Sequence, residues 1–210
     1  MVLAFKSFLA MGSYVTVSFL VAGIPFGYLI VRFVGNMDIR KHGSGNIGAT
    51  NVWRVLGAKY AILTFLLDGL KSFLPVLLVR ILSVKFPLGI FPHYFVSLVL
   101  LSTVASHIFS PWLGWHGGKG VSSFILGLLA MNPNIFLIVA SSWLLAFSIF
   151  RISGLSAILS VLMAIVGSFF ILDKVNFSLM LLIALLILWA HRKNLKELMS
   201  NAFGSGRTKK

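Results

Sequence analysis

Residues 120–150, with the sequence GVSSFILGLLAMNPNIFLIVASSWLLAFSIF, carry no charged side chain over 31 consecutive positions. Two further charge-free runs cover 7–31, with 25 residues, and 86–118, with 33 residues. A helix needs about 20 apolar residues to cross the hydrocarbon core of a bilayer, so the two longer runs must contain turns. None of the runs alternates polar and apolar residues with the period of a strand, which excludes an outer-membrane barrel. The sequence therefore predicts an all-α, polytopic integral membrane protein.

The composition of the whole chain also indicates a bilayer environment. Of the 210 residues, 59% are hydrophobic and 10% are charged, whereas soluble domains hold about a quarter charged residues. The formal net charge is +14, from 18 Lys and Arg against four acids. Because the basic residues are scattered between apolar spans, the charge is interpreted as setting topology and attracting anionic lipids or substrates, and nucleic acid is not an expected partner. Cysteine is absent, which excludes disulfides, thiolate catalysis and cysteine-ligated metals.

Turn signals divide the chain into about seven expected transmembrane helices. Their approximate bounds are 8–33, 55–83, 93–108, 121–131, 135–150, 155–172 and 176–190. The first run is interpreted as a retained helix, since it is long and lacks a small-x-small cleavage site. Seven crossings place thirteen Lys and Arg on one face and four on the other, so the positive-inside rule predicts an external N-terminus and a cytoplasmic C-terminus. We expect one transmembrane domain over 1–203, followed by a basic tail at 204–210 that is either disordered or foreign to the native chain.

The polar stretch at 43–54, GSGNIGATNVWR, is the first candidate for an anion-binding site. Its glycines let backbone N–H groups approach an anion closely, and Arg54 offers a planar fork of donors to a phosphate. A flexible loop between two helices is the second interpretation, but it does not explain so many donors with no acid among them. The hydroxyl and amide side chains expected to bind substrate oxygens are Ser44, Asn46, Thr50 and Asn51.

Two further motifs fall on the same predicted face. Gly117-Gly118-Lys119-Gly120 is interpreted as a phosphate cradle at a helix start, where amide dipoles favour anions. It is not a nucleotide P-loop, because Gly120 stands where that motif requires Ser or Thr. His191 and Asn194 lie three positions apart, so on a continuing helix they would face the same ligand.

Three ionisable residues fall within or at the end of predicted spans. Asp68 and Lys71 would each cost roughly 2.5–3.5 kcal/mol to insert alone, and as an i,i+3 pair they most simply neutralise each other. For this pair and His107, a proton relay and a structural role both stay open. No carboxylate pair, serine-nucleophile elbow or metal cluster can be assembled, so an enzyme with this sequence would bind anions, hold them close and offset developing charge.

Together these motifs resemble the bacterial acyl-phosphate:glycerol-3-phosphate acyltransferase family, the PlsY type. The matching segments, in chain order, are 24–28, 38–41, 43–54 with 56–57, 67–68 with 71, 107 with 109–111, 117–121, and 191–192 with 194. The chain departs from the family pattern at a few positions. Ala22-Gly23 replaces a usual Gly-Ser, and Ser106 replaces a usual glycine. The serines usual after Arg151 fall on Gly154 and Ala157, so Ser153 or Ser156 is expected to substitute for them.

The resemblance implies a seven-helix enzyme of the bacterial cytoplasmic (inner) membrane, with its active site facing the cytoplasm. Such enzymes transfer a fatty acyl group from acyl phosphate to the 1-hydroxyl of glycerol 3-phosphate, giving lysophosphatidic acid and phosphate. No cofactor or metal is expected, and the partners are the two substrates and membrane lipids, with the oligomeric state open. The implied catalytic residues are Lys119, His191, Asn194 and Arg54. The implied substrate-binding residues are Ser44, Asn46, Thr50, Asn51, Gly117, Gly118, Gly120, Ser153 and Ser156.

A transporter or flippase for a phosphorylated solute or lipid is the alternative function. It would require polar groups near the membrane midplane that open to each side in turn. The donors in this sequence gather at one predicted face, and only Asp68 and Lys71 lie deep, which favours the enzyme.

Overall fold

The structure is a computed structural model that describes residues 2–85 and 92–203. The described part of the chain is helical and contains no strand. Its α-helices are α1 (Val2–Ala22), α2 (Phe26–Gly35), α3 (Ala49–Leu56), α4 (Ala58–Lys85), α5 (Phe95–Ile108), α6 (Val121–Met131), α7 (Pro133–Phe150), α8 (Ser153–Ile171), α9 (Lys174–Ala190) and α10 (Arg192–Phe203), and short 3₁₀ turns form at η1 (Ile39–Lys41) and η2 (Pro111–Leu113). The predicted all-α fold is confirmed, and the expected tail at 204–210 lies outside the described residues.

Every predicted transmembrane helix has a helical counterpart. Five segments of the described chain are long and apolar enough to cross a membrane: α4, α7, α8, α5 together with η2, and the α1–α2 pair. The α9–α10 pair, which bends by 57°, would make a sixth, whereas α6 is apolar but has only 11 residues. The all-α integral membrane class is thus supported, while seven crossings and the orientation of the termini stay predictions.

Apolar side chains on the outside of the bundle fit a lipid environment. Leu144 is 63% exposed, Phe169 65% and Phe170 79%. A row of exposed large aliphatic and aromatic side chains costs free energy in water but none against acyl chains. The inside is also apolar, with Phe95 and Phe124 fully or almost fully buried.

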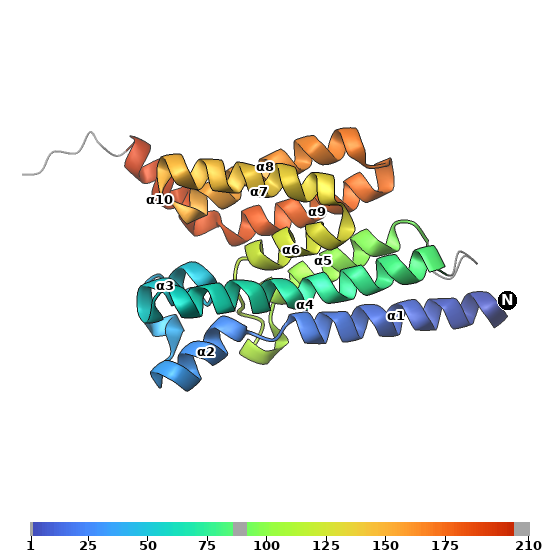
Figure 1. The fold of residues 1–210 in the computed structure, drawn as a ribbon, viewed down its shortest axis with the longest axis horizontal. Helices are drawn as coiled ribbons and strands as arrows, with labels where there is room; N and C mark the ends of the chain where they lie inside the picture. The colour runs from blue at the N-terminus through green and yellow to red at the C-terminus, as the bar shows by residue number, and fades with distance from the viewer. Residues whose placement is uncertain (1, 86–91, 204–210) are drawn as a thin grey trace, which may run out of the picture.

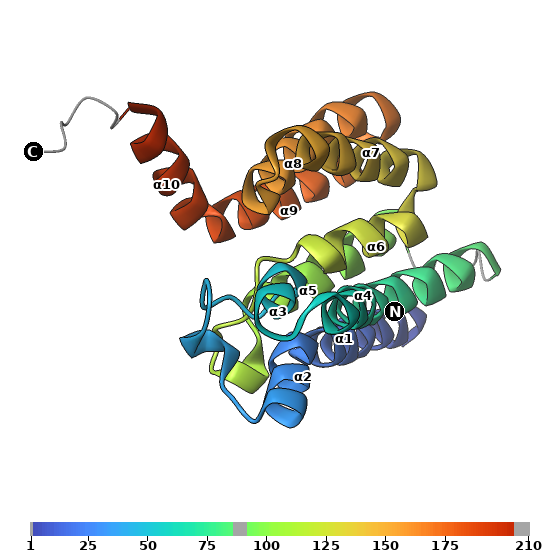
Figure 2. The same cartoon turned by 60° about the vertical axis from the view of Figure 1, so that its left-hand side comes forward.

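The helices pack as two groups joined by α5 and α6 (Figure 1). In that view α7, α8 and α9 lie on one side, and α1, α2 and α4 lie on the other. The main contacts are α4 on α6, α7 on α8, α1 on α5 and α5 on α9. The helices α2, α3 and α10 lie at the same end of the bundle in Figure 1, and the turned view in Figure 2 shows α10 on the side of α7, α8 and α9 and α2 and α3 on the opposite side.

The predicted single helix at 8–33 is wrong at residues 23–25, where the chain breaks between α1 and α2. Pro25 has no N–H to continue a helical ladder, and it precedes α2 as its N-cap. A break inside a membrane leaves carbonyls without intrahelical donors, which must find partners elsewhere in the protein.

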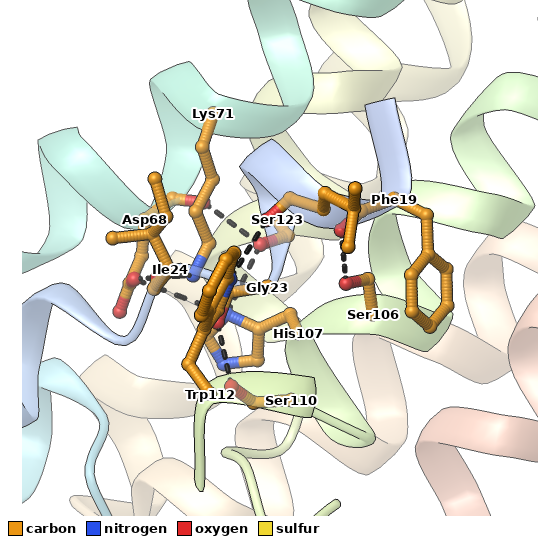
Figure 3. A network of polar contacts seen from close by, with 11 residues as sticks. Phe19, Gly23, Ile24, Asp68, Lys71, Ser106, His107, Ser110, Trp112 and Ser123 are labelled. Atoms are coloured by element: carbon orange, nitrogen blue, oxygen red, sulfur yellow. Dashed lines mark hydrogen bonds and ion pairs between the residues drawn. The ribbon is translucent and has the colours of Figure 1, made fainter. Parts of the chain in front are cut away.

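Side chains of α4 and of the segment after α5 supply these partners (Figure 3). Lys71 Nζ donates to the carbonyl of Ile24 at 2.6 Å, and Ser110 Oγ donates to that of Gly23 at 2.7 Å. Ser106 Oγ donates to the carbonyl of Phe19, so the departure from the family's usual glycine adds a bond to the broken helix. The break is thereby fixed to α4 and α5.

The polar stretch expected as a loop folds in its second half into α3. This helix ends at Gly57, which has a φ of 85° that other residues rarely adopt, and α4 begins directly afterwards at Ala58. The predicted second helix, 55–83, therefore starts three residues later than expected. As a result, Thr50, Asn51 and Arg54 lie on a helix rather than on a flexible loop.

Candidate active site

A pocket of about 1010 Å³ lies where α3, the starts of α6 and α8, and the α9–α10 junction meet. It brings together segments from the first, middle and last thirds of the chain. Its polar and charged lining residues are Ser44, Asn46, Thr50, Asn51, Arg54, His107, Ser122, Lys119, Arg151, Ser153, His191, Asn194 and Glu197. All four residues predicted as catalytic are in this lining, and so are Ser44, Asn46, Thr50, Asn51, Gly120 and Ser153 from the predicted binding set.

Three helix N-termini open onto this pocket. The residues preceding α3, α6 and α8 are Gly48, Gly120 and Ile152, and all three line the pocket. None of the three helices has a side-chain cap, whereas Asn132 and Asp173 cap α7 and α9 at the other end of the bundle. First-turn N–H groups have no partner within their helix and carry the positive end of its dipole. The pocket is therefore built for anions.

The first two glycines of the Gly117–Gly120 motif do not contribute amides to the pocket. The N–H of Gly117 donates to the carbonyl of Ile108 at 2.9 Å, and that of Gly118 to the carbonyl of His107 at 3.0 Å. A Cβ at Gly118 would collide with the imidazole of His107. These glycines thus allow the loop to approach the end of α5. Contrary to the prediction, the structure does not place them in the lining of the pocket. Gly120 does reach it, with a φ of 82°.

Lys119 is the cation that this loop presents to the pocket. Its ammonium donates to the side-chain oxygen of Asn194 on α10. Burial lowers the pKa of Lys119, and the nearby charges of Arg54 and Lys193 lower it further, while Glu197 raises it. The lowered pKa thus reflects mainly the burial of the ammonium, whose charged form an anionic substrate would stabilise.

His191 is buried at the α9–α10 junction, with 2% exposure. Its Nδ1 lies 2.8 Å from the carbonyl of Ile187. A carbonyl only accepts, so Nδ1 carries a proton, and in the neutral ring Nε2 is left as an acceptor. His191 and Asn194 both line the pocket, as their spacing predicts.

Asn51 shapes the polar loop from within. Its side-chain amide donates to the carbonyls of His42 and Asn46 at 2.9 Å each, and its oxygen accepts from the N–H of Ser44 at 2.9 Å. It is 1% exposed, and a Cβ at Gly43 would collide with its oxygen. Although Asn51 lines the pocket, its hydrogen-bonding groups hold the loop in shape, a positioning role that the sequence did not predict.

The two candidate serines of α8 have different surroundings. Ser153 lines the pocket, and its hydroxyl lies 3.0 Å from that of Thr50, which joins α8 to α3. Ser156 is fully buried, donates to the carbonyl of Ile152 and does not line the pocket. At 100° per residue, Ser153, Gly154 and Ala157 share the pocket-facing side of α8, and Ser156 lies off that side. Ser156 therefore does not reach the pocket, contrary to the expectation that it binds substrate.

Gly154 lies against the side chain of Asn194. A Cβ at that position would lie 2.8 Å from the amide nitrogen of Asn194. A serine at this position would therefore require the Asn194 amide, which accepts from Lys119, to move.

Arg151 and Glu197 are pocket residues that the sequence analysis did not select. Arg151 forms the turn between α7 and α8 with a φ of 56°, an uncommon backbone conformation for arginine that is often found at functional sites. Its place on the predicted basic face was a usable signal. Glu197 follows Asn194 by three positions, which is the same spacing that linked Asn194 to His191.

Beneath the pocket, α4, α5 and α6 share a buried polar network (Figure 3). Asp68 and Lys71 form an ion pair at 2.8 Å, with side chains 1% and 3% exposed. Ser123 Oγ donates to the backbone carbonyl of Asp68 at 2.8 Å and lies 3.2 Å from His107 Nδ1. Of the predicted trio, only His107 lines the pocket. The ion pair and its bond to Ile24 support the structural interpretation of Asp68 and Lys71.

The fold and the site together define a class of protein: a helical integral membrane protein with a cationic pocket at one end, suited to phosphate-bearing substrates. The chain belongs to the glycerol-3-phosphate acyltransferase family, whose family model matches residues 13–201. Relatives of that name include one from Agrobacterium fabrum, 38% identical over 88% of this chain and 86% of its own length. Another, from Acholeplasma laidlawii, is 37% identical over 87% of each chain.

Solved structures of PlsY, an integral membrane glycerol 3-phosphate acyltransferase, have the same fold. Its glycerol 3-phosphate form is 34% identical, with a TM-score of 0.83 over 91% of this chain and 93% of that one. Its lysophosphatidic acid form is 33% identical, with a TM-score of 0.80 over the same shares. The predicted membership of the PlsY family is thus confirmed.

Proposed function

We propose that this protein transfers a fatty acyl group from acyl phosphate to the 1-hydroxyl of glycerol 3-phosphate, giving lysophosphatidic acid and phosphate. The observation that carries the proposal is the convergence of three uncapped helix N-termini with Lys119, Arg54 and Arg151 on one pocket. Both substrates bear a phosphate, so a site that holds them together must offset several negative charges. The solved relative, which binds glycerol 3-phosphate and lysophosphatidic acid, supports the same pair for this chain.

In the proposed arrangement each phosphate has its own donors. Lys119 and the free amides at the start of α6 hold the acyl phosphate. Arg54, His191 and Asn194 hold glycerol 3-phosphate next to it, since Asn194 accepts from Lys119. Placing two anions in reacting geometry supplies much of the rate enhancement, because it replaces an unfavourable encounter in solution.

The reaction then needs no protein nucleophile, since acyl phosphate is already an activated mixed anhydride. The 1-hydroxyl oxygen attacks the acyl carbon, and the bond from that carbon to the phosphate oxygen breaks. The hydroxyl proton passes to His191 Nε2 or to a substrate phosphate oxygen, and it finally leaves on the released phosphate. Lys119 and the helix N-termini stabilise the negative charge that develops on the carbonyl and leaving oxygens.

The position of the pocket supports an orientation of the protein in the membrane. The pocket lies at the end of the bundle that carries Arg54, Lys119 and Arg151. We infer a bacterial inner-membrane enzyme with seven crossings, an external N-terminus and a cytoplasmic pocket. Glycerol 3-phosphate would then enter from the cytoplasm, and the acyl donor would enter from the bilayer.

The test is a donor comparison with purified protein in lipid nanodiscs. Labelled glycerol 3-phosphate is mixed with palmitoyl phosphate, palmitoyl-CoA or palmitoyl acyl carrier protein, and lysophosphatidic acid is measured. We expect product from palmitoyl phosphate alone. Product from either thioester at a comparable rate would refute the proposed donor, and no product from any donor would refute the reaction.

A further inference from the structure

The pocket continues from its polar mouth into an apolar groove. On α7 the lining residues are Phe136, Ala140, Trp143, Leu144 and Phe147. Their spacing of three or four positions places them on one stripe of the helix, which reaches Arg151 at the mouth one turn later. The stripe therefore forms one continuous wall that runs from the anion site towards the start of α7.

The opposite wall and the floor come from α4 and α6. Phe65 lines the groove from α4, and Ile125 and Leu126 line it from α6. In the described chain α4 and α7 both pack on α6 but hardly on each other, so α6 forms the floor between two walls. A Cβ at Gly69 would collide with Leu126, which shows how closely α4 lies on this floor.

The far end of the groove is the turn between α6 and α7. Only Asn132 separates the two helices, and its side chain caps α7 by accepting from the N–H groups of Asn134 and Ile135. Phe136, on the first turn of α7, is the lining residue of α7 nearest to this end. Ala140, one turn nearer the mouth, is the smallest side chain of the stripe.

The dimensions fit one acyl chain. The α7 lining from Phe136 to Arg151 spans about 22 Å, and one leaflet of a bilayer's hydrocarbon core is about 15 Å thick. The pocket volume of about 1010 Å³ is at the upper end of the range for small-molecule sites, as an anionic head with an attached chain requires.

We propose that Ala140 and Phe136 determine the longest acyl chain that this groove accepts. The proposal rests on the proposed function, because it assigns the chain to the same substrate. The chain extends from the polar mouth over α6, passes the small Ala140, and ends against the ring of Phe136. Enlarging Ala140 shortens the groove, and truncating Phe136 lengthens it.

The experiment measures acylation rates with decanoyl, palmitoyl and arachidoyl phosphate. Ala140→Phe is expected to lower the palmitoyl-to-decanoyl rate ratio by about tenfold or more, in line with losses from misfitted apolar groups. Phe136→Ala is expected to raise the arachidoyl-to-palmitoyl ratio. The matched control is Leu137→Ala, because Leu137 is the neighbour of Phe136 but is 59% exposed and does not line the pocket. Ala140→Leu is a milder variant to use if the phenylalanine disturbs folding.

Rate ratios that stay at the wild-type values in both groove variants, with activity retained, would overturn the proposal. A binding measurement separates this failure from failure of the proposed reaction. If no acyl phosphate is used, the same variants are titrated with lysophosphatidic acids of the three chain lengths. A chain-length dependence that changes in the groove variants but not in the control would support the groove, and an unchanged one would overturn it.

Discussion

Replacing Lys119 by alanine is the sharpest perturbation of the proposed mechanism. The substitution removes the ammonium that the loop before α6 presents to the pocket, and it leaves Arg54, Arg151 and three helix N-termini in place. Loss of one preorganised donor of this kind costs about 2.7–4 kcal/mol of transition-state stabilisation, or about 10²–10³ in kcat. Because the remaining donors still bind both anions, we expect the loss mainly in kcat, with a smaller change in KM.

A second role of Lys119 has to be separated from this one, because its ammonium also donates to Asn194 on α10. If Lys119 served only to anchor α10, then Asn194→Ala would cost as much as Lys119→Ala, and the double variant would cost no more than either. If Lys119 and Asn194 each contact a substrate, the double variant must cost more than either single variant.

The assay measures initial rates of lysophosphatidic acid formation over a matrix of both substrate concentrations. Lys59→Ala is the control, because Lys59 lies at the same end of the bundle, is exposed and does not line the pocket. Thermal unfolding of each variant in detergent checks that the fold survives. A kcat for Lys119→Ala that equals the kcat of wild type would refute the assignment of Lys119 to the reacting phosphate.

Three further outcomes are expected. Burial and neighbouring cations lower the pKa of Lys119 in the free enzyme, and the charged form binds phosphate. The value of kcat/KM should therefore fall as pH rises through a pKa below the ordinary 10.5. Replacing Lys119 by arginine should move that fall to higher pH, and an unshifted profile would contradict the assignment. Lys71→Met should destabilise the protein by about 3–5 kcal/mol in reversible denaturation, whereas the double variant with Asp68→Asn should lose less, since it leaves no unpaired buried charge. A double-variant loss equal to the sum of the two single-variant losses would show that the two residues are not coupled. Gly118→Ala should lower both the melting temperature and the activity, because its Cβ would collide with a buried imidazole, whereas Gly12→Ala, whose Cβ meets nothing within 4 Å, should do neither.

The helix positions were largely predictable from the sequence, and their ends were less so. The expected starts of α7, α8 and α9 were each two residues late. For α7 and α9 the reason is visible in the caps, since Asn132 and Asp173 accept from first-turn amides and thereby start the helix earlier. Length and hydropathy determine that a helix forms, but its first residue depends on a cap that pattern analysis places only roughly.

The break between α1 and α2 was missed for a different reason. Pro25 was visible in the sequence, but a proline alone can also kink a membrane helix without ending it. The helix ends here because Lys71 and Ser110, far away in the sequence, accommodate the freed carbonyls of Ile24 and Gly23. No local pattern contains that information.

The sequence by itself determined the all-α membrane class, the polar motifs and the family, because hydropathy, charge and short motifs are local properties of the chain. Only the tertiary structure decided which donors point into the pocket. Gly117 and Gly118 contact α5, Ser156 bonds to its own helix, and Arg151 joins the lining instead. The physical reason is that a group already hydrogen-bonded within the protein is less available to a ligand, and whether it is so bonded depends on how the whole chain folds.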